Sequence, residues 1–106
     1  MIFEQIPVGP MQNFAYLIGD EKTGLAAAVD PAWDVDTIVD AAEKNNLRIV
    51  YAISTHNHQD HTSGNGELVK KTGAKIVAFA SSRIRKDIGV GDGERLQLGS
   101  LELKFI

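Results

Sequence analysis

Short apolar runs alternate with helical patterns through the middle of the chain, and this alternation limits the fold more than any other feature. Residues 25–29 and 47–54 are apolar runs with the length of buried strands. Between them, apolar residues recur with the spacing of one helical face, at Val35, Ile38, Val39 and Ala42. A second short helix over 66–72 and a strand over 75–79 follow. The pattern predicts an α/β layered domain.

Turn-forming residues indicate where the earlier elements begin and end. Two apolar runs, 3–8 and 14–18, flank a Gly-Pro pair, which predicts two strands around a turn. The polar, glycine-bounded segment 19–24 predicts a hairpin loop. Asp34 is a candidate N-cap for the first helix, and Asn45 or Asn46 can adopt the left-handed conformation that closes it.

The last quarter of the chain predicts a short helix over 81–87, a turn over 91–93 and a final pair of strands over 95–98 and 101–106. The sequence stops at Phe105-Ile106, inside the last of these apolar strands. Natural domains usually finish beyond their last element, so we interpret this end as a cut.

Composition narrows the classes of protein that this chain can represent. A length of 106 residues with 43% hydrophobic content suits one soluble domain over 1–106. The net charge of −3 argues against a nucleic-acid partner. The chain has no cysteine, no signal peptide pattern and no membrane-length apolar run, so we expect a cytoplasmic protein with no membrane partner.

The three histidines of the chain all fall within six residues, directly after the predicted buried strand 47–54. They are His56, His58 and His61, and Asp60 lies between the last two. Imidazole and carboxylate are ligands that zinc, iron and manganese share. His56 and His58 point to the same side of a loop and can close on one ion, whereas a tight turn can direct Asp60 and His61 toward a second ion. The cluster predicts a metal site.

The pattern H-x-H-x-D-H after an apolar strand resembles the signature of the metallo-β-lactamase superfamily. Its flanks, Thr55 to Asn65, are similar to the glyoxalase II (hydroxyacylglutathione hydrolase) branch and to the related persulfide dioxygenases. Segments 13–18, 29–31 and 91–99 resemble other parts of that family. The resemblance implies an αββα sandwich built from two similar halves. Residues 1–106 would be its N-terminal half, a mixed sheet with helices on one face.

The resemblance also implies a role for each residue of the cluster. His56 and His58 would bind the first metal ion, and Asp60 and His61 the second. The complete site would hold two zinc ions, with iron or manganese as alternatives. Asp60 would in addition orient the attacking hydroxide, which makes it the catalytic residue. Asp30 would stand beside the metal ligands without touching the metal, although an ordinary Asp-Pro turn explains it equally well.

Three interpretations of function follow. The first is a metal-dependent hydrolase, most similar to a glyoxalase II-type thioesterase acting on an acyl-glutathione or another small thiol conjugate. The second is a persulfide dioxygenase that uses one iron and takes only His56 from this loop. The third is a non-enzymatic half-domain that self-associates or awaits a missing C-terminal half. Because the remaining metal ligands of the family would lie in that half, we expect the isolated chain to have little or no activity.

Overall fold

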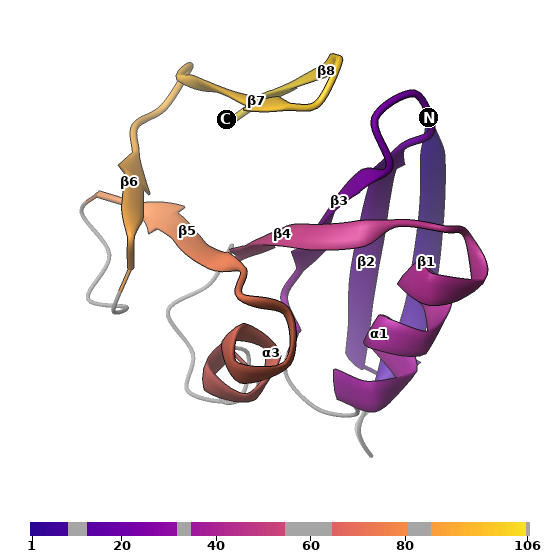
Figure 1. Ribbon diagram of the computed structural model, residues 1–106. Coiled ribbons are helices and arrows are strands. Elements are labelled where there is room, and N and C mark those ends of the chain that lie inside the picture. The colour runs from indigo at the N-terminus through magenta and orange to yellow at the C-terminus, as the bar shows by residue number, and fades with distance from the viewer. Residues whose placement is uncertain (9–12, 32–34, 55–64, 81–85, 106) are drawn as a thin grey trace.

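A six-stranded mixed sheet forms the centre of the computed structural model, which describes residues 1–8, 13–31, 35–54, 65–80 and 86–105. The strands lie side by side in chain order (Figure 1). The first three pair antiparallel, and the pairs from the third to the sixth are parallel. Their bounds are β1 (Ile2–Val8), β2 (Asn13–Asp20), β3 (Leu25–Val29), β4 (Arg48–Ile53), β5 (Lys75–Phe79) and β6 (Ile88–Val90).

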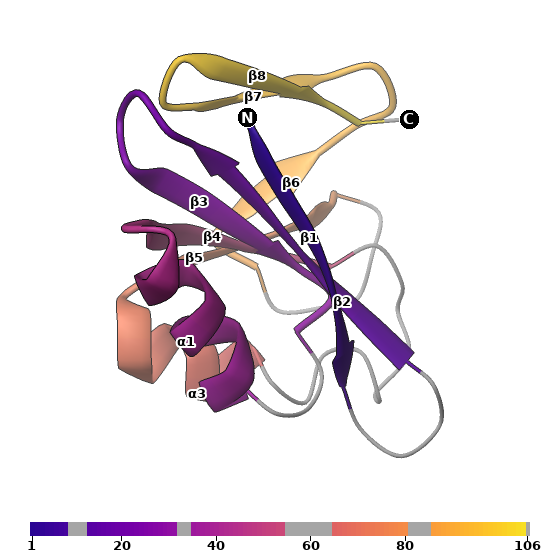
Figure 2. The same cartoon turned by 90° about the vertical axis from the view of Figure 1, so that its right-hand side faces the viewer.

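The two faces of this sheet carry different layers. Helices α1 (Val35–Lys44) and α3 (Asn65–Thr72) both pack on one face, as Figures 1 and 2 show from two directions. A separate hairpin of β7 (Arg95–Leu98) and β8 (Leu101–Lys104) lies over the opposite face. The predicted α/β architecture, a mixed sheet with its helices on one face, is therefore confirmed.

Small side chains on the sheet allow the helices to approach it closely. Ala26, Ala28 and Ala52 lie on the helix side of β3 and β4 and are fully buried. Larger side chains fill the space above them, namely Leu17 from β2, Ile38 from α1 and Leu68 from α3, all fully buried. This helix-side core fixes both helices against the parallel part of the sheet, because a close-packed interior tolerates few displacements.

Both helices end through residues that adopt the left-handed conformation, as the sequence predicted for the first helix. Asn46 closes α1 with a φ of 57°, and the amide of Leu47 donates back to the carbonyl oxygen of Ala42 at 2.9 Å. Gly73 closes α3 with a φ of 73°, and its amide donates to Val69 at 2.8 Å. The predicted N-cap of α1, Asp34, lies outside the described residues.

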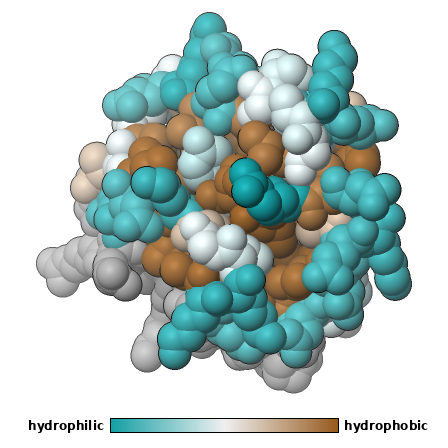
Figure 3. Space-filling model, viewed as in Figure 1, coloured by the Kyte–Doolittle hydropathy of each residue, from teal (hydrophilic) through white to brown (hydrophobic). Residues whose placement is uncertain are grey.

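A second apolar cluster lies between the sheet and the β7–β8 hairpin. Its buried members come from five strands: Ala27, Ile53, Val77, Val90 and Leu98. The ring of Phe105 meets that of Phe79 edge to face, with 6.3 Å between their centroids. Most of the other residues in this cluster stay partly exposed. Figure 3 shows apolar residues reaching the surface in the middle of one face of the molecule, among hydrophilic ones.

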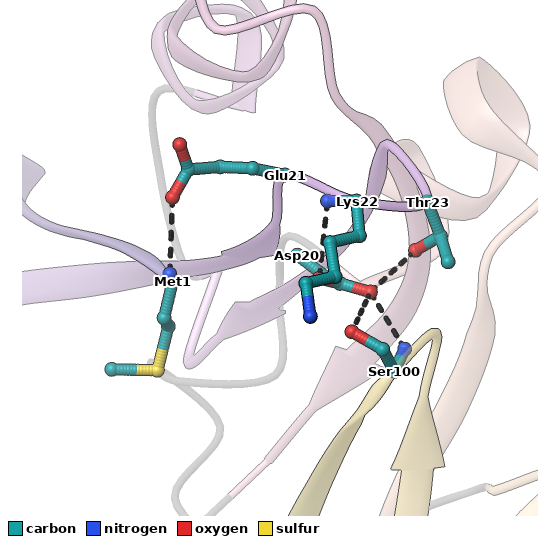
Figure 4. A network of polar contacts seen from close by, with 6 residues as sticks. All are labelled: Met1, Asp20, Glu21, Lys22, Thr23 and Ser100. Atoms are coloured by element: carbon teal, nitrogen blue, oxygen red, sulfur yellow. Dashed lines mark hydrogen bonds and ion pairs between the residues drawn. The ribbon is translucent and has the colours of Figure 1, made fainter.

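One buried carboxylate attaches the hairpin to the sheet. Asp20, at the end of β2 and 3% exposed, accepts hydrogen bonds from the amide of Ser100 at 2.6 Å and from its hydroxyl at 2.8 Å. The hydroxyl of Thr23 donates to the same carboxylate at 2.7 Å, and the amide of Lys22 donates at 3.2 Å (Figure 4). Gly99 has a φ of 59° and leaves no room for a Cβ beside Asp20 and Thr23. The turn between β7 and β8 is therefore held on the turn between β2 and β3.

We expect Asp20→Asn to destabilise the protein at neutral pH and to weaken its acid dependence. Hydrogen bonds to the carboxylate hold the pKa of Asp20 well below its ordinary value of 3.8. The bond from the amide of Ser100 has the largest effect, followed by the bond from the Thr23 hydroxyl. The folded state therefore keeps this carboxylate ionised where the unfolded state has begun to protonate it. Its stabilising effect is complete above about pH 5 and falls as the pH drops below 4. We expect the variant to melt at least about 5 °C lower at pH 7.

Thermal unfolding followed by circular dichroism from neutral to acid pH would measure both effects. Glu21→Gln is the matched control, because Glu21 is exposed and its one ion pair within the described residues is with the N-terminal amine, at 3.0 Å. Exposed pairs contribute little, so this variant should melt close to the wild type. An Asp20→Asn variant with the melting temperature and acid limb of the wild type would contradict the assignment.

The structure differs from the sequence prediction in four places. Strand β8 ends at Lys104, whereas the sequence predicted a strand over 101–106. Strand β6 was not predicted, since only Ile88, Gly89 and Val90 form it. The predicted helix over 81–87 is wrong at its end, where Lys86 and Asp87 are not helical, and 81–85 lie outside the described residues. Strand β2 runs through Gly19 and Asp20, which the sequence placed in a loop. Neither α1 nor α3, the helices of the described part, has the length and apolar character needed to span a bilayer.

Candidate functional site

The carboxyl ends of the parallel strands meet at one edge of the sheet, and the candidate site belongs to that edge. β3, β4 and β5 run in the same direction, so the segments that follow them leave from the same side. Asp30 directly follows β3, and Ser54 directly follows β4. In open α/β sheets, ligands bind outside the carboxyl ends of the strands. In the sequence, segment 55–64, which contains every histidine, follows Ser54 and precedes α3.

Backbone hydrogen bonds connect these strand ends in series. The amide of Asp30 donates to Ile53 at 2.7 Å, the amide of Ser54 donates to Val77 at 2.9 Å, and the amide of Ala80 donates to Val90 at 2.9 Å. In each case, the first residue after one strand donates to a residue of the neighbouring strand. The starting point of segment 55–64 is therefore fixed to the sheet.

Asp30 combines burial with an unusual backbone conformation. It is 6% exposed and has a φ of 54°, in the left-handed region that few residues other than glycine and asparagine or aspartate adopt. Strained backbone of this kind tends to occur at functional sites, where the surrounding structure imposes it. Asp30 is therefore a buried residue at the carboxyl edge of the sheet, and its role beside the metal ligands stays a prediction.

The four predicted metal ligands, His56, His58, Asp60 and His61, lie outside the described residues. Their positions in the structure are therefore not assigned, and the ligand set stays a prediction. Within the described residues, no group of three or more histidine, cysteine, aspartate or glutamate side chains could hold a metal ion. The donor chemistry of the four side chains nevertheless suits zinc, iron or manganese. The structure shows a fixed attachment at Ser54 before them and a helix after them.

Ser54 is a polar residue of this edge to which sequence analysis gave no role. It is 3% exposed and immediately precedes segment 55–64. The signal in the sequence was the pair of hydroxyl residues, Ser54 and Thr55, between the apolar run and the histidines. Since buried polar side chains in proteins are nearly always bonded, a polar residue at that position indicates a structural constraint at the site.

Comparison with known proteins agrees with this architecture. The family model of the metallo-β-lactamase superfamily matches residues 8–85, which is more than half of the chain, so the chain belongs to that superfamily. A hydroxyacylglutathione hydrolase of Methylococcus capsulatus is 36% identical over 105 residues, and the match covers 96% of this chain and 40% of the relative. A cytoplasmic hydroxyacylglutathione hydrolase of Arabidopsis thaliana is 40% identical over 91 residues, covering 82% and 34%.

Among solved structures, ETHE1 from Myxococcus xanthus superimposes with a TM-score of 0.90 at 30% identity. That match covers 98% of this chain and 47% of the other chain. The matches thus span 40% and 34% of the two hydrolases named above and about half of the ETHE1 chain. The glyoxalase II-like resemblance predicted from the histidine motif is confirmed at the level of sequence relatives.

Proposed function

We propose that this chain carries the metal-binding strand-end loop of a glyoxalase II-type thioester hydrolase. The observation that supports it best is that the H-x-H-x-D-H segment follows Ser54, which lies at the carboxyl edge of the parallel strands, in a chain related to hydroxyacylglutathione hydrolases. The substrate class would be a small acyl-thiol conjugate such as an acyl-glutathione. The compartment we propose is the cytoplasm, in keeping with the absence of cysteine and with the Arabidopsis relative.

The proposed roles of the residues follow from their donor atoms. His56 and His58 would hold one ion, and Asp60 and His61 a second, through imidazole nitrogens and a carboxylate oxygen. A bound zinc, iron or manganese ion supplies Lewis acidity, which lowers the pKa of a water molecule and polarises a carbonyl group. Asp60 would orient the attacking water, and the fixed attachment at Ser54 would hold the loop in place. Thioester hydrolysis then breaks the C–S bond, forms a C–O bond and releases a thiol and a carboxylic acid.

Thiol release from an acyl-glutathione thioester tests this proposal directly. The chain contains no cysteine, so a thiol-reactive chromophore detects the product without a background from the protein. We expect the metal-loaded chain to cleave the thioester slowly, in preference to a lactone or a phosphodiester. We expect Asp60→Asn to lower the rate by at least about 100-fold, because it removes both a ligand and the group that orients the nucleophile. Cleavage of another ester class, with the thioester left intact, would overturn the assigned substrate.

A second candidate is an iron-dependent persulfide dioxygenase, and the likeness to ETHE1 is in line with it. Such an enzyme would take a single iron and consume molecular oxygen. Oxygen uptake with glutathione persulfide, measured on iron-loaded protein, separates the two candidates. A chain that cleaves the thioester and consumes no oxygen with the persulfide is the hydrolase.

A further inference from the structure

Strand β4 contains a bulge near its beginning, in the ladder that it forms with β3. Ala26 of β3 lies opposite Ile49 of β4. The next residue of β3, Ala27, lies opposite Tyr51, so Val50 is an extra residue in β4. Bulges are rare between parallel strands, and they often occur next to functional sites, where they change the direction of a side chain.

The two apolar clusters show how this bulge changes the alternation of side chains along β4. Ile49, before the bulge, belongs to the helix-side core. Val50 and Tyr51 are consecutive, yet both pack against the cluster beneath the hairpin. Ala52 lies in the helix-side core again, and Ile53 lies in the cluster beneath the hairpin. In a regular strand that starts at Ile49, the last two would be exchanged, because side chains alternate strictly. The bulge therefore sets the direction of every residue after it.

Ser54 continues the alternation and points toward the helix side. Its amide donates to Val77 at 2.9 Å, directly after the pair of Ile53 and Val77, so the ladder extends to this residue. The carbonyl oxygen of the same peptide group, which belongs to Ile53, accepts from the amide of Asp30 at 2.7 Å. The peptide group in front of segment 55–64 is thus bonded to a neighbouring strand on both sides. Without the bulge, the hydroxyl of Ser54 would lie on the opposite face of the sheet.

The helix side is an unfavourable place for a polar side chain. Ser54 is only 3% exposed, and the preceding residue on the same face is Ala52 of the apolar helix-side core. Both α1 and α3 contact β4 on this side. A buried hydroxyl nearly always has a hydrogen-bond partner, and burying it without one costs free energy. An alanine would pack here without that requirement, so the hydroxyl indicates a polar role at the beginning of the histidine segment.

We propose that the Ser54 hydroxyl, directed by the bulge in β4, is a positioning group for the metal ligands of segment 55–64. The inference rests on the proposed function, in which these ligands bind zinc, iron or manganese. In this role Ser54 acts through the segment that follows it and does not bind the metal itself. Removal of a group that supports metal ligands typically lowers metal affinity by about 10-fold to 100-fold.

Zinc titration of Ser54→Ala against a competing chromophoric chelator tests this role. We expect the dissociation constant for zinc to rise at least about tenfold. Thr72→Val is the matched control, because it also removes one hydroxyl, at the end of α3 that is further along the chain from the histidines. The Thr72 hydroxyl donates to Leu68 at 2.7 Å and accepts from the amide of Ala74 at 3.1 Å. We expect both variants to melt at similar temperatures and the control to bind zinc within about threefold of the wild type.

Nuclear magnetic resonance of the metal-free protein gives a readout that does not depend on metal binding. The three histidines of the chain all lie in segment 55–64, so their imidazole signals report on this segment alone. We expect Ser54→Ala to shift the signals of at least one histidine. Thr72→Val should leave the signals of all three in place.

The outcomes separate this inference from the proposed function. Zinc binding that is equal in Ser54→Ala and in the wild type would overturn the positioning role and leave the metal site standing. Equal losses of zinc affinity in Ser54→Ala and Thr72→Val would also overturn it, because lower stability would then be the cause. A wild-type chain that binds no zinc, iron or manganese would overturn the proposed ligand set. In that case unshifted histidine signals in Ser54→Ala would overturn the role of Ser54 as well.

Discussion

Replacing His58 with alanine is expected to lower the zinc affinity of the chain by at least about 100-fold. Loss of groups that only support metal ligands typically lowers affinity between 10-fold and 100-fold, and His58 is proposed to be a ligand itself. Elemental mass spectrometry after extensive dialysis measures the metal retained per chain. The wild type should retain zinc, or iron if the dioxygenase candidate is correct. The variant should retain none.

Gln59→Ala is the matched control for this experiment. Gln59 lies inside the same segment, between His58 and Asp60, at a position that the motif leaves variable. Its replacement should leave the retained metal within about threefold of the wild type, since no ligand is removed. Equal metal retention in His58→Ala and in the wild type would contradict the assigned ligand set. A wild-type chain that retains no metal would identify it as a non-enzymatic half-domain.

Replacing Leu68 with alanine is expected to lower the free energy of unfolding by about 2–5 kcal/mol. Leu68 is fully buried in the helix-side core, where it packs α3 against the sheet. The substitution leaves a cavity that the closely packed alanines beneath it cannot fill. Small domains have a total stability of only about 5–15 kcal/mol, so a loss of this size removes a large part of it. Urea unfolding followed by circular dichroism measures the change.

Lys70→Ala, two residues further along α3, provides the comparison. Lys70 is exposed, and surface substitutions of this kind change stability by less than about 0.5 kcal/mol. Because α3 follows the histidine segment directly, the Leu68→Ala variant should also retain less metal at a temperature where it is still folded. Equal urea midpoints for Leu68→Ala and Lys70→Ala would show that α3 does not pack as described.

Local sequence signals predicted most of the described elements. The apolar run 25–29 became β3 with the predicted bounds, and the helical spacing of Val35, Ile38 and Ala42 gave the buried side of α1. Asn46 took the left-handed conformation expected at the end of the first helix. These features depend on residues close together in the chain, which is the range over which propensity and periodicity carry information.

The features that sequence analysis missed depend on distant residues. Strand β6 has only three residues and pairs with β5, so no periodic pattern marks it. The contact between Asp20 and Ser100 joins residues 80 positions apart. The polar residues around Asp20 do not indicate this contact in the sequence. Burial of Asp30 and Ser54 likewise follows from the sheet rather than from their neighbours in the chain. For the metal site, residue types and spacing predicted the ligands, whereas their arrangement depends on the fold around segment 55–64.

The contact between Asp20 and Ser100 has a consequence for the order in which the protein folds. The hairpin needs only neighbouring residues to form, whereas its attachment to Asp20 closes a loop of 80 residues in the chain. Closing so long a loop costs chain entropy before any contact compensates for it. We therefore expect the sheet and its two helices to assemble first and the hairpin to dock afterwards. By the same reasoning, we expect the hairpin to be the first layer that detaches during unfolding. Its detachment exposes the apolar face beneath it, and aggregation of a partly unfolded chain would begin there.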